Sequence, residues 1–349
     1  MDMKALVVGT AGKVEIRQID RPRPASHQAL VKTIGGGICG TDGTLLHGSF
    51  KGIEPAQYPL VLGHESVGRV VEVGTDVTSY TVGDVVLLPF VPNPTEAGRP
   101  LGSAWGAFSE FTLVDDIAAF EAGTVAGPAP EAAVAQSIVP ASIEPLHAPV
   151  IVTLREVLSS IYVSGIDVAE PVVIYGSGPV AMTFARLLRL LGATQIIAVV
   201  RSEEKASLMQ QFGATTCINS RAVDVAGAVG DLLPGGVGAV IDAVGHPSVI
   251  NEALPMLRDR GILFCYGVPK EGSMHIDWSR APYNWTLKFQ QMPRKDEEGA
   301  CHQQVIDWVE SGDLVLGDFV SDVVPIDEAP AFFADYLGGK TSGKIVLSF

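Results

Sequence analysis

The sequence predicts a mixed α/β chain in which a β-rich, barrel-like part comes first and a doubly wound parallel sheet follows. Across residues 1–145, short apolar runs are separated by Gly, Pro and Asp, a spacing typical of closely connected strands. From about Glu170 onward, short apolar strands alternate with helical segments, which indicates a parallel sheet covered on both faces. A chain of 349 residues also has room for about two domains.

We therefore expect one domain over residues 1–146, completed by residues 292–349, and a second over residues 147–291. The Pro- and Gly-rich segment Pro89–Gly102 is expected to be a surface loop. Near the end of the chain we expect amphipathic helices at Gln303–Ser311 and Ala329–Leu337. The expected strands of the first domain are Lys4–Val8, Ala29–Thr33, Val67–Val73, Asp84–Leu88, Phe108–Val114 and Lys344–Phe349.

In the second domain, strands and helices are expected to alternate along the chain. The expected strands are Val172–Tyr175, Gln195–Val200, Gly238–Ala243, Gly261–Tyr266 and, at an outer edge of the sheet, Thr286–Gln291. The expected helices are Val180–Leu191, Ser202–Phe212, Val223–Leu233 and Ser248–Leu257.

Composition and charge disfavour several classes of protein. With 39 acidic and 24 basic residues the formal charge is −15, which argues against binding to nucleic acid. The sequence has no run of about 18 apolar residues and its acidic start does not resemble a secretory signal, so we expect no membrane span. The four cysteines are scattered, which argues against a disulfide framework and leads us to expect a cytoplasmic protein.

The segment Val172–Ala181 has the pattern of a dinucleotide-binding turn, because a short apolar strand leads into Gly-Ser-Gly-Pro-Val-Ala. Gly176 would allow the tight turn, and Gly178 would let the backbone approach a pyrophosphate. Pro179 suits a first helical turn, and Ala181 would let the helix pack closely on the strand. A glycine turn that binds nothing is the alternative, but the strand before it and the helix and strand after it favour a nucleotide site.

The end of the second strand of this domain discriminates between NAD and NADP. A carboxylate there would hold the ribose 2′-hydroxyl, whereas an arginine would accept a 2′-phosphate. The strand ends in Val200, and Arg201 and Ser202 follow with no carboxylate at the strand end. Because a guanidinium can bind phosphate through two hydrogen bonds, Arg201 favours NADP, unless it is an ordinary solvated surface residue.

Two short segments of the first domain contain residue types that bind zinc. Cys39 follows a glycine-rich stretch, and His64 and Glu65 follow Gly63. A thiolate, an imidazole and a carboxylate suit a catalytic zinc with an open position. Adjacent side chains on an extended backbone point to opposite faces, so His64 and Glu65 can share one metal only if the chain bends at Gly63. Otherwise Glu65 lies behind the metal, and Glu144 is a second candidate carboxylate.

Taken together, these motifs resemble the zinc-dependent medium-chain alcohol dehydrogenases, and the resemblance covers essentially the whole chain. It implies a GroES-like catalytic domain followed by a Rossmann dinucleotide-binding domain, with a C-terminal return to the first. A finer similarity to polyol and glucose-type dehydrogenases involves Gly37–Asp42 and His302–Val305. The resemblance is carried by Cys39–Asp42, Gly63–Gly68, Val82–Val86, Gly106–Glu110, Glu144–Leu146, the glycine turn and Asp242–Gly245.

The resemblance implies a catalytic zinc between the two domains, with Cys39 and His64 as ligands. Glu65 and Glu144 match the carboxylates that coordinate this metal directly or through water in polyol and sugar dehydrogenases. Many relatives bind a second, structural zinc through four clustered cysteines. The segment Pro89–Gly106 contains none, so we expect one zinc per subunit.

Several neighbours of these ligands have expected roles. Thr41 matches the hydroxyl residue of the family's proton relay, and Asp42 is expected to orient the ligand turn or His64. His47 either lines the pocket or completes the relay, or is an exposed loop residue. Phe90 and Trp105 are candidates for the pocket wall. Contacts to the cofactor are expected from Gly176, Ser177, Gly178, Pro179, Val180, Arg201, Ser202 and Val244.

The expected function is that of a zinc-dependent oxidoreductase that transfers a hydride between a secondary alcohol, polyol or sugar hydroxyl and NAD(P). Zinc would lower the pKa of a bound hydroxyl and, in the reverse direction, polarise a carbonyl. Because relatives pair the outer edge of the nucleotide sheet between subunits, a homodimer or homotetramer is expected. The alternatives are a zinc-free quinone or enoyl reductase of the same fold and a non-catalytic NADP-binding redox sensor.

Overall fold

The computed structural model describes residues 2–10, 12–269, 272–337 and 343–349, and the chain divides into two compact units. Unit 1 is Met1–Arg155 with Lys295–Phe349, and unit 2 is Glu156–Arg294. The division falls inside helix α3 (Pro149–Ser164), shortly after the boundary expected at residue 146. Helix α3 was not predicted because almost all of its residues are buried, so it has no clear polar face.

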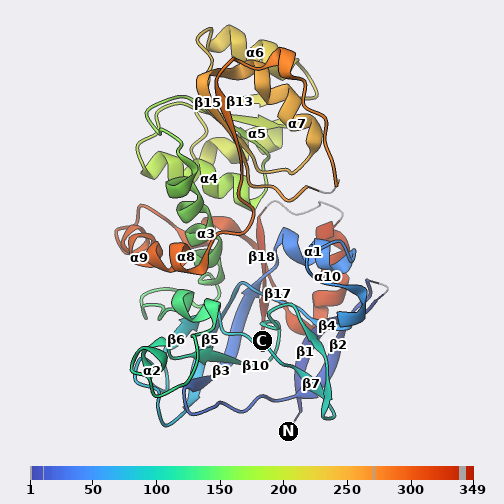
Figure 1. Ribbon diagram of the computed structural model, residues 1–349, viewed down its shortest axis with the longest axis vertical. Coiled ribbons are helices and arrows are strands. Elements are labelled where there is room, and N and C mark those ends of the chain that lie inside the picture. The colour runs from blue at the N-terminus through green and yellow to red at the C-terminus, as the bar shows by residue number, and fades with distance from the viewer. Residues whose placement is uncertain (1, 11, 270–271, 338–342) are drawn as a thin grey trace. The chain divides into compact units, whose positions relative to one another are not determined.

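Unit 1 contains two main sheets and a short hairpin (Figure 1). The first sheet has the order β2 (Val14–Asp20), β1 (Asp2–Val8), β4 (Leu60–Val61), β9 (Gly102–Ser103). The second has the order β17 (Val320–Pro325), β18 (Lys344–Ser348), β3 (Gln28–Gly37), β5 (Ser66–Val73), β6 (Val85–Leu87), and β10 (Phe111–Asp115) also pairs with β3. The hairpin consists of β7 (Thr95–Glu96) and β8 (Arg99–Pro100).

The helices of unit 1 are short and join or cover these sheets (Figure 1). Among the helices in the described part of the chain, none combines the length and the apolar character needed to cross a lipid bilayer. Besides α3, the α-helices are α1 (Gly40–Leu46), α2 (Ile117–Glu121), α8 (Lys295–Ala300), α9 (His302–Glu310) and α10 (Ala329–Leu337).

The segment Pro89–Gly102 is more ordered than the expected surface loop, because it contains the β7–β8 hairpin. Polar contacts from β2 hold this hairpin. Thr95 Oγ1 donates to Asp20 Oδ2 at 2.6 Å, and Arg17 Nε donates to Glu96 Oε1 at 3.0 Å. Hydrogen bonds and an ion pair therefore support a segment that contains no metal-binding cysteines.

Unit 2 is a doubly wound parallel sheet, as predicted. Its strand order is β13 (Thr216–Asn219), β12 (Ile196–Val200), β11 (Val172–Tyr175), β14 (Val237–Asp242), β15 (Leu257–Cys265), β16 (Trp285–Phe289), and all five neighbouring pairs are parallel. Strand β13 was not expected from the sequence, because it is short and contains Thr and Asn. The helices are α4 (Pro179–Leu190), α5 (Glu203–Gln211), α6 (Val225–Leu232) and α7 (Pro247–Ala253).

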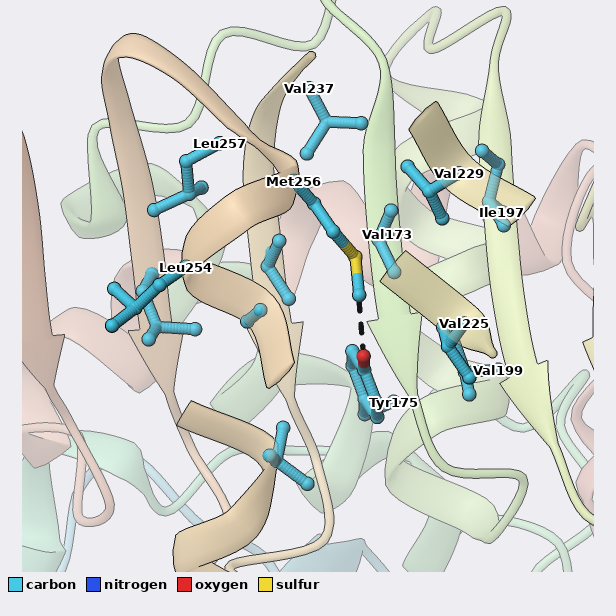
Figure 2. Close-up of a cluster of buried hydrophobic side chains, with 14 of the residues drawn as sticks. Val173, Tyr175, Ile197, Val199, Val225, Val229, Val237, Leu254, Met256 and Leu257 are labelled. Atoms are coloured by element: carbon cyan, nitrogen blue, oxygen red, sulfur yellow. Dashed lines mark hydrogen bonds between the residues drawn. The ribbon is translucent and has the colours of Figure 1, made fainter. Parts of the chain in front are cut away.

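Apolar side chains cover both faces of the central strands of this sheet. On one face, Val173 and Tyr175 of β11 belong to a buried cluster with residues of α6 and α7, and the Tyr175 hydroxyl points to the Met256 sulfur at 4.0 Å (Figure 2). On the other face, Phe184 of α4 packs edge-on against Tyr266 with ring centres 5.3 Å apart. Each fully buried large apolar side chain contributes about 1.5–3 kcal/mol, so these layers hold β11 firmly in place.

Helix α9 begins with His302, whose ring makes contacts through both nitrogens. Nε2 lies 3.1 Å from the Ile138 carbonyl oxygen, and Nδ1 lies 3.4 Å from Nη1 of Arg155. A neutral ring with its proton on Nε2 satisfies both contacts, because it donates to the carbonyl and accepts from the guanidinium. Burial and the Arg155 charge lower the pKa of His302 to about 4, although the bond to Ile138 opposes this shift.

Acid should destabilise unit 1 through His302. Between pH 6.5 and about 4, the unfolded histidine binds a proton that the folded ring excludes, so stability present at neutral pH is lost as the pH falls. We expect this group to account for about 2 kcal/mol of lost stability between pH 7 and pH 5. Urea unfolding of the wild type and of His302→Gln at both pH values measures the contribution. An equal loss in the variant would contradict the assignment.

Candidate metal centre and nucleotide turn

Cys39, His64 and Glu65 each offer a possible metal-ligand atom, and these atoms all lie within 4.8 Å of one another. Cys39 follows β3 and is the N-cap of α1, whereas His64 and Glu65 come immediately before β5. Strands β3 and β5 pair antiparallel, and the Gly37 N–H donates to the Glu65 carbonyl at 2.7 Å. The end of one strand and the start of the next therefore bring the three donors together.

Gly63 provides the bend that two neighbouring ligands require. Its φ is +105°, a left-handed value that favours glycine. A Cβ at this position would lie 2.4 Å from the Phe108 nitrogen, so no larger residue fits without a shift of the backbone. Because the chain turns here, the adjacent His64 and Glu65 both reach the same group.

The Glu65 carboxylate is buried in an ion pair with Lys344. Glu65 Oε2 lies 2.5 Å from Lys344 Nζ, and Oε1 accepts from Thr153 Oγ1 at 3.2 Å. Glu65 is 0% exposed and Lys344 is 3% exposed. Gly37 leaves the space for this pair, because a Cβ there would lie 2.8 Å from Glu65 Oε2. Sequence reasoning missed Lys344 and Thr153, since only the pairing of β18 with β3 and the packing of α3 reveal them.

Asp42 links the Cys39 turn to His64. Its Oδ2 accepts from the Cys39 N–H at 2.9 Å, and its Oδ1 lies 3.7 Å from His64 Nδ1. Neither Asp42 Oδ1 nor His64 Nδ1 has a hydrogen-bond partner among the described residues. These contacts are compatible with both expected roles of Asp42, orienting the turn and orienting the imidazole.

The electrostatics of this group favour a cation. Burial lowers the pKa of His64, but the Asp42 carboxylate and the Cys39 sulfur outweigh it and raise the pKa to about 10. Burial raises the pKa of Asp42, whereas the neighbouring His64 opposes that shift. The Asp42 carboxylate, with the Cys39 side chain beside it, thus favours a positive charge on the imidazole. A zinc ion would replace that proton, because a ligand histidine is neutral, so the donor set fits zinc.

Thr41 and Trp105 lie beside these donors. Thr41 Oγ1 is 3.9 Å from the Cys39 sulfur, and the side chain is half-buried at the start of α1. The Trp105 ring centre is 5.0 Å from that of His64, and the backbone of Trp105 has a φ of +65°. Trp105 therefore forms part of the wall around the imidazole.

His47 and Glu144 are not part of the group of three donors that the described residues form. His47 is exposed at the C-cap of α1. Glu144 is also exposed, and its Oε1 accepts from the Leu146 N–H at 3.4 Å. Of the two expected carboxylates, only Glu65 meets Cys39 and His64 in this structure.

The glycine turn of unit 2 has the form that the sequence predicts. Gly176 follows β11 with a φ of +119°, and Gly178 is the N-cap of α4, in which Pro179 and Val180 form the first turn. A Cβ on Gly178 would meet nothing within 4 Å, and the N–H groups of Ser177 and Gly178 donate to no group among the described residues. Free donors around an open space suit the pyrophosphate of a nicotinamide dinucleotide.

The remaining expected cofactor residues lie at the same edge of the sheet. The strand order reverses between β11 and β14, where doubly wound sheets bind nucleotides. Val244, just after β14, has Cγ2 3.4 Å from the position of a Cβ on Gly176. Arg201 is exposed directly after β12, and Ser202 caps α5 by accepting from the Lys205 N–H at 3.3 Å.

Comparison with known proteins places these features in a family. Residues 25–122 match the alcohol dehydrogenase GroES-like domain, and residues 179–301 match the family described as zinc-binding dehydrogenase. Glucose 1-dehydrogenase 2 of Vulcanisaeta moutnovskia is 31% identical over 291 residues, which are 78% of each chain. An alcohol dehydrogenase of Geobacillus stearothermophilus is 30% identical over 76% of this chain and 78% of its own.

A solved structure extends this similarity to the whole chain. The crystal structure of a zinc-binding dehydrogenase from Sinorhizobium meliloti bound to NADP is 25% identical, has a TM-score of 0.79 and covers 100% of both chains. The chain described here therefore belongs to the zinc-binding dehydrogenases, the zinc-type medium-chain alcohol and polyol dehydrogenases. It is an oxidoreductase that uses a nicotinamide cofactor and acts on small molecules, which confirms the family and the activity expected from the motifs.

The buried pair of Glu65 and Lys344 predicts that removing only one of its two charges destabilises the protein. In Lys344→Met, the Glu65 carboxylate loses its cation, and an uncompensated buried charge should destabilise the metal-free protein by about 3–5 kcal/mol. The double variant Lys344→Met/Glu65→Gln should recover most of this loss, because the amide carries no charge and can still accept from Thr153. Urea unfolding of the metal-free proteins measures both. Equal midpoints for the single and double variants would show that charge is not the cause.

Proposed function

We propose that this protein oxidises a hydroxyl of a secondary alcohol, polyol or sugar with NADP, or reduces the corresponding carbonyl with NADPH, at a single zinc site. The observation that carries this proposal is the convergence of Cys39, His64 and Glu65 donor atoms within 4.8 Å, in a chain that also has an open glycine turn. Glucose and alcohol dehydrogenases among the relatives support this range of substrates.

We infer that Cys39 and His64 bind the zinc and that Glu65 is the third donor. When bound, zinc would supply a Lewis acid that lowers the pKa of a substrate hydroxyl or polarises a carbonyl. Asp42 keeps the His64 ring oriented, and the contact with Lys344 keeps the Glu65 carboxylate in place. Glu144 lies outside the group and would need a movement of its segment to reach it.

In this proposal, Thr41 accepts the proton that the substrate hydroxyl loses during oxidation and passes on its own. Its hydroxyl lies next to the Cys39 sulfur, so a substrate hydroxyl near the ligand group would be within reach of it. A hydroxyl can accept one proton while donating its own, which suits a relay rather than a permanent base. His47 is exposed at the end of the same helix, where it could pass the proton to solvent.

The zinc assignment predicts that substitution of Cys39 or His64 removes both the bound zinc and the turnover. We expect about one zinc per chain in the wild type and little in Cys39→Ala or His64→Ala, with turnover reduced about a thousandfold or more. The matched control is Cys217→Ala, which removes a half-buried free thiol from unit 2. Metal analysis and cofactor reduction with a panel of sugars, polyols and secondary alcohols measure the two effects.

The alternatives give different results in the same experiment. Turnover without zinc would indicate a zinc-free reductase, and cofactor binding without turnover on any substrate would indicate a redox sensor. A Cys39→Ala variant that retains zinc and full turnover would refute the ligand assignment.

We further propose that NADP is preferred to NAD. Arg201 is exposed at the carboxyl end of β12, and no carboxylate takes the place that would hold a ribose 2′-hydroxyl. We expect a higher kcat/KM with NADP than with NAD, and we expect Arg201→Gln to lower the NADP value about tenfold while changing the NAD value less than twofold. Steady-state kinetics with both cofactors tests this, and a strong preference for NAD in the wild type would overturn it.

We also propose that the protein is a homo-oligomer that associates through β16. Within the described residues, β16 pairs only with β15, so its outer edge is open. Trp278 and Tyr283, which come shortly before it, are exposed aromatic residues. An open edge beside exposed aromatic rings favours pairing with another copy.

Association through β16 predicts that substitutions near β16 lower the molecular mass measured in solution. Light scattering should give at least twice the chain mass for the wild type, and Trp278→Glu/Tyr283→Glu should shift the population toward the monomer, because charges would be placed in the contact. The control Tyr162→Glu places a charge at another exposed tyrosine of unit 2. A monomeric wild type would contradict the proposal.

A further inference from the structure

Two arginines follow the carboxyl ends of adjacent strands in unit 2. Val200 ends β12 and Asn219 ends β13, and these two residues are partners in the parallel register. Ser220 ties the two ends together, because its N–H and its hydroxyl both donate to the Val200 carbonyl, at 2.9 and 3.1 Å. Arg201 and Arg221 therefore leave the sheet from neighbouring points on the same edge.

Neither guanidinium is compensated. Arg201 and Arg221 are exposed, and their side chains have no ion pair or hydrogen bond to any residue that the structure describes. Two other arginines of unit 2 do have partners: Arg186 donates to a main-chain carbonyl, and Arg258 pairs with a carboxylate. These two neighbouring cations lie in a chain with a formal charge of −15.

Two acidic side chains near these arginines in the sequence, Glu203 and Asp224, have other partners. Glu203 Oε1 accepts from Asn219 Nδ2 at 3.4 Å, and Asp224 Oδ2 caps α6 by accepting from the Gly227 N–H at 2.8 Å. The backbone of Arg221 is itself fixed, because its N–H donates to Asn219 Oδ1 at 3.1 Å. The position of Arg221 is thus defined locally while its charge remains available to a ligand.

We propose that Arg221 acts with Arg201 to bind the 2′-phosphate of NADP, and that it is a second determinant of cofactor specificity. This inference rests on the proposed preference for NADP. A phosphate monoester carries a charge of about −1.5 to −2 at neutral pH, so two guanidiniums balance it better than one. NAD has a neutral hydroxyl at this position, and Arg221 would gain little from it.

The test measures binding directly, so it does not depend on turnover. The full-length wild type, Arg201→Gln, Arg221→Gln and the double variant are titrated with NADPH and NADH by fluorescence, and with adenosine 2′,5′-bisphosphate and 5′-AMP by calorimetry. Arg280→Gln is the matched control. It removes the same charge from the same unit, but Arg280 lies shortly before β16, at the sheet edge opposite β13.

We expect Arg221→Gln to weaken NADPH and the bisphosphate about tenfold, and NADH and 5′-AMP less than twofold, with Arg280→Gln unchanged. Unchanged 5′-AMP binding would also show that the variant is folded. If only Arg201→Gln weakens NADPH, the role of Arg221 is wrong and the NADP preference stands. Equal weakening of NADPH and NADH by Arg221→Gln would also overturn the inference. If the wild type binds NADH at least as tightly as NADPH, both proposals fail.

Discussion

The buried ion pair between Glu65 and Lys344 is the constraint on which unit 1 depends. A carboxylate with no exposure to water is costly unless a cation compensates it, and the cation here comes from the last strand of the chain. The pair forms because β18 lies against β3, so it links the C-terminal segment to the start of β5 in the first unit. Gly37 makes the pair possible, because any side chain there would occupy the space of the Glu65 carboxylate.

The same pair sets the electrostatics of the ligand group. Lys344 lies against the Glu65 carboxylate, and the Asp42 carboxylate is the group that most strongly raises the pKa of His64, followed by the Cys39 side chain. The group therefore attracts a cation but is not strongly anionic when it has none. A thiolate and an imidazole that are fixed in this way can bind a metal without a large rearrangement, and Lys344 lets a third donor remain in a buried site.

In unit 2, the glycine turn depends on small residues, which leave space around the backbone. Gly176 adopts a left-handed backbone, Gly178 opens a space, and Ala181 lies close to the position of a Cβ on Gly176. The result is a pair of N–H groups, those of Ser177 and Gly178, that have no partner among the described residues and lie at the reversal point of the sheet. Unit 1 contributes charged and soft donors for a metal, and unit 2 contributes neutral backbone donors for phosphate groups.

The sequence alone determined what depends on local chemistry. The glycine turn, the alternation of strands and helices, and the two separate ligand motifs, Cys39 after its glycine-rich stretch and Gly63–His64–Glu65, each follow from residue types within a few positions of one another. The tertiary structure alone decided which carboxylate meets the other donors, that Lys344 and Thr153 hold it, and that the segment Pro89–Gly102 contains a hairpin. It also decided that almost every face of α3 is buried, which removed the periodic pattern that would have revealed this helix. These outcomes depend on strand register and packing between residues far apart in the chain, and neither leaves a local pattern in the sequence.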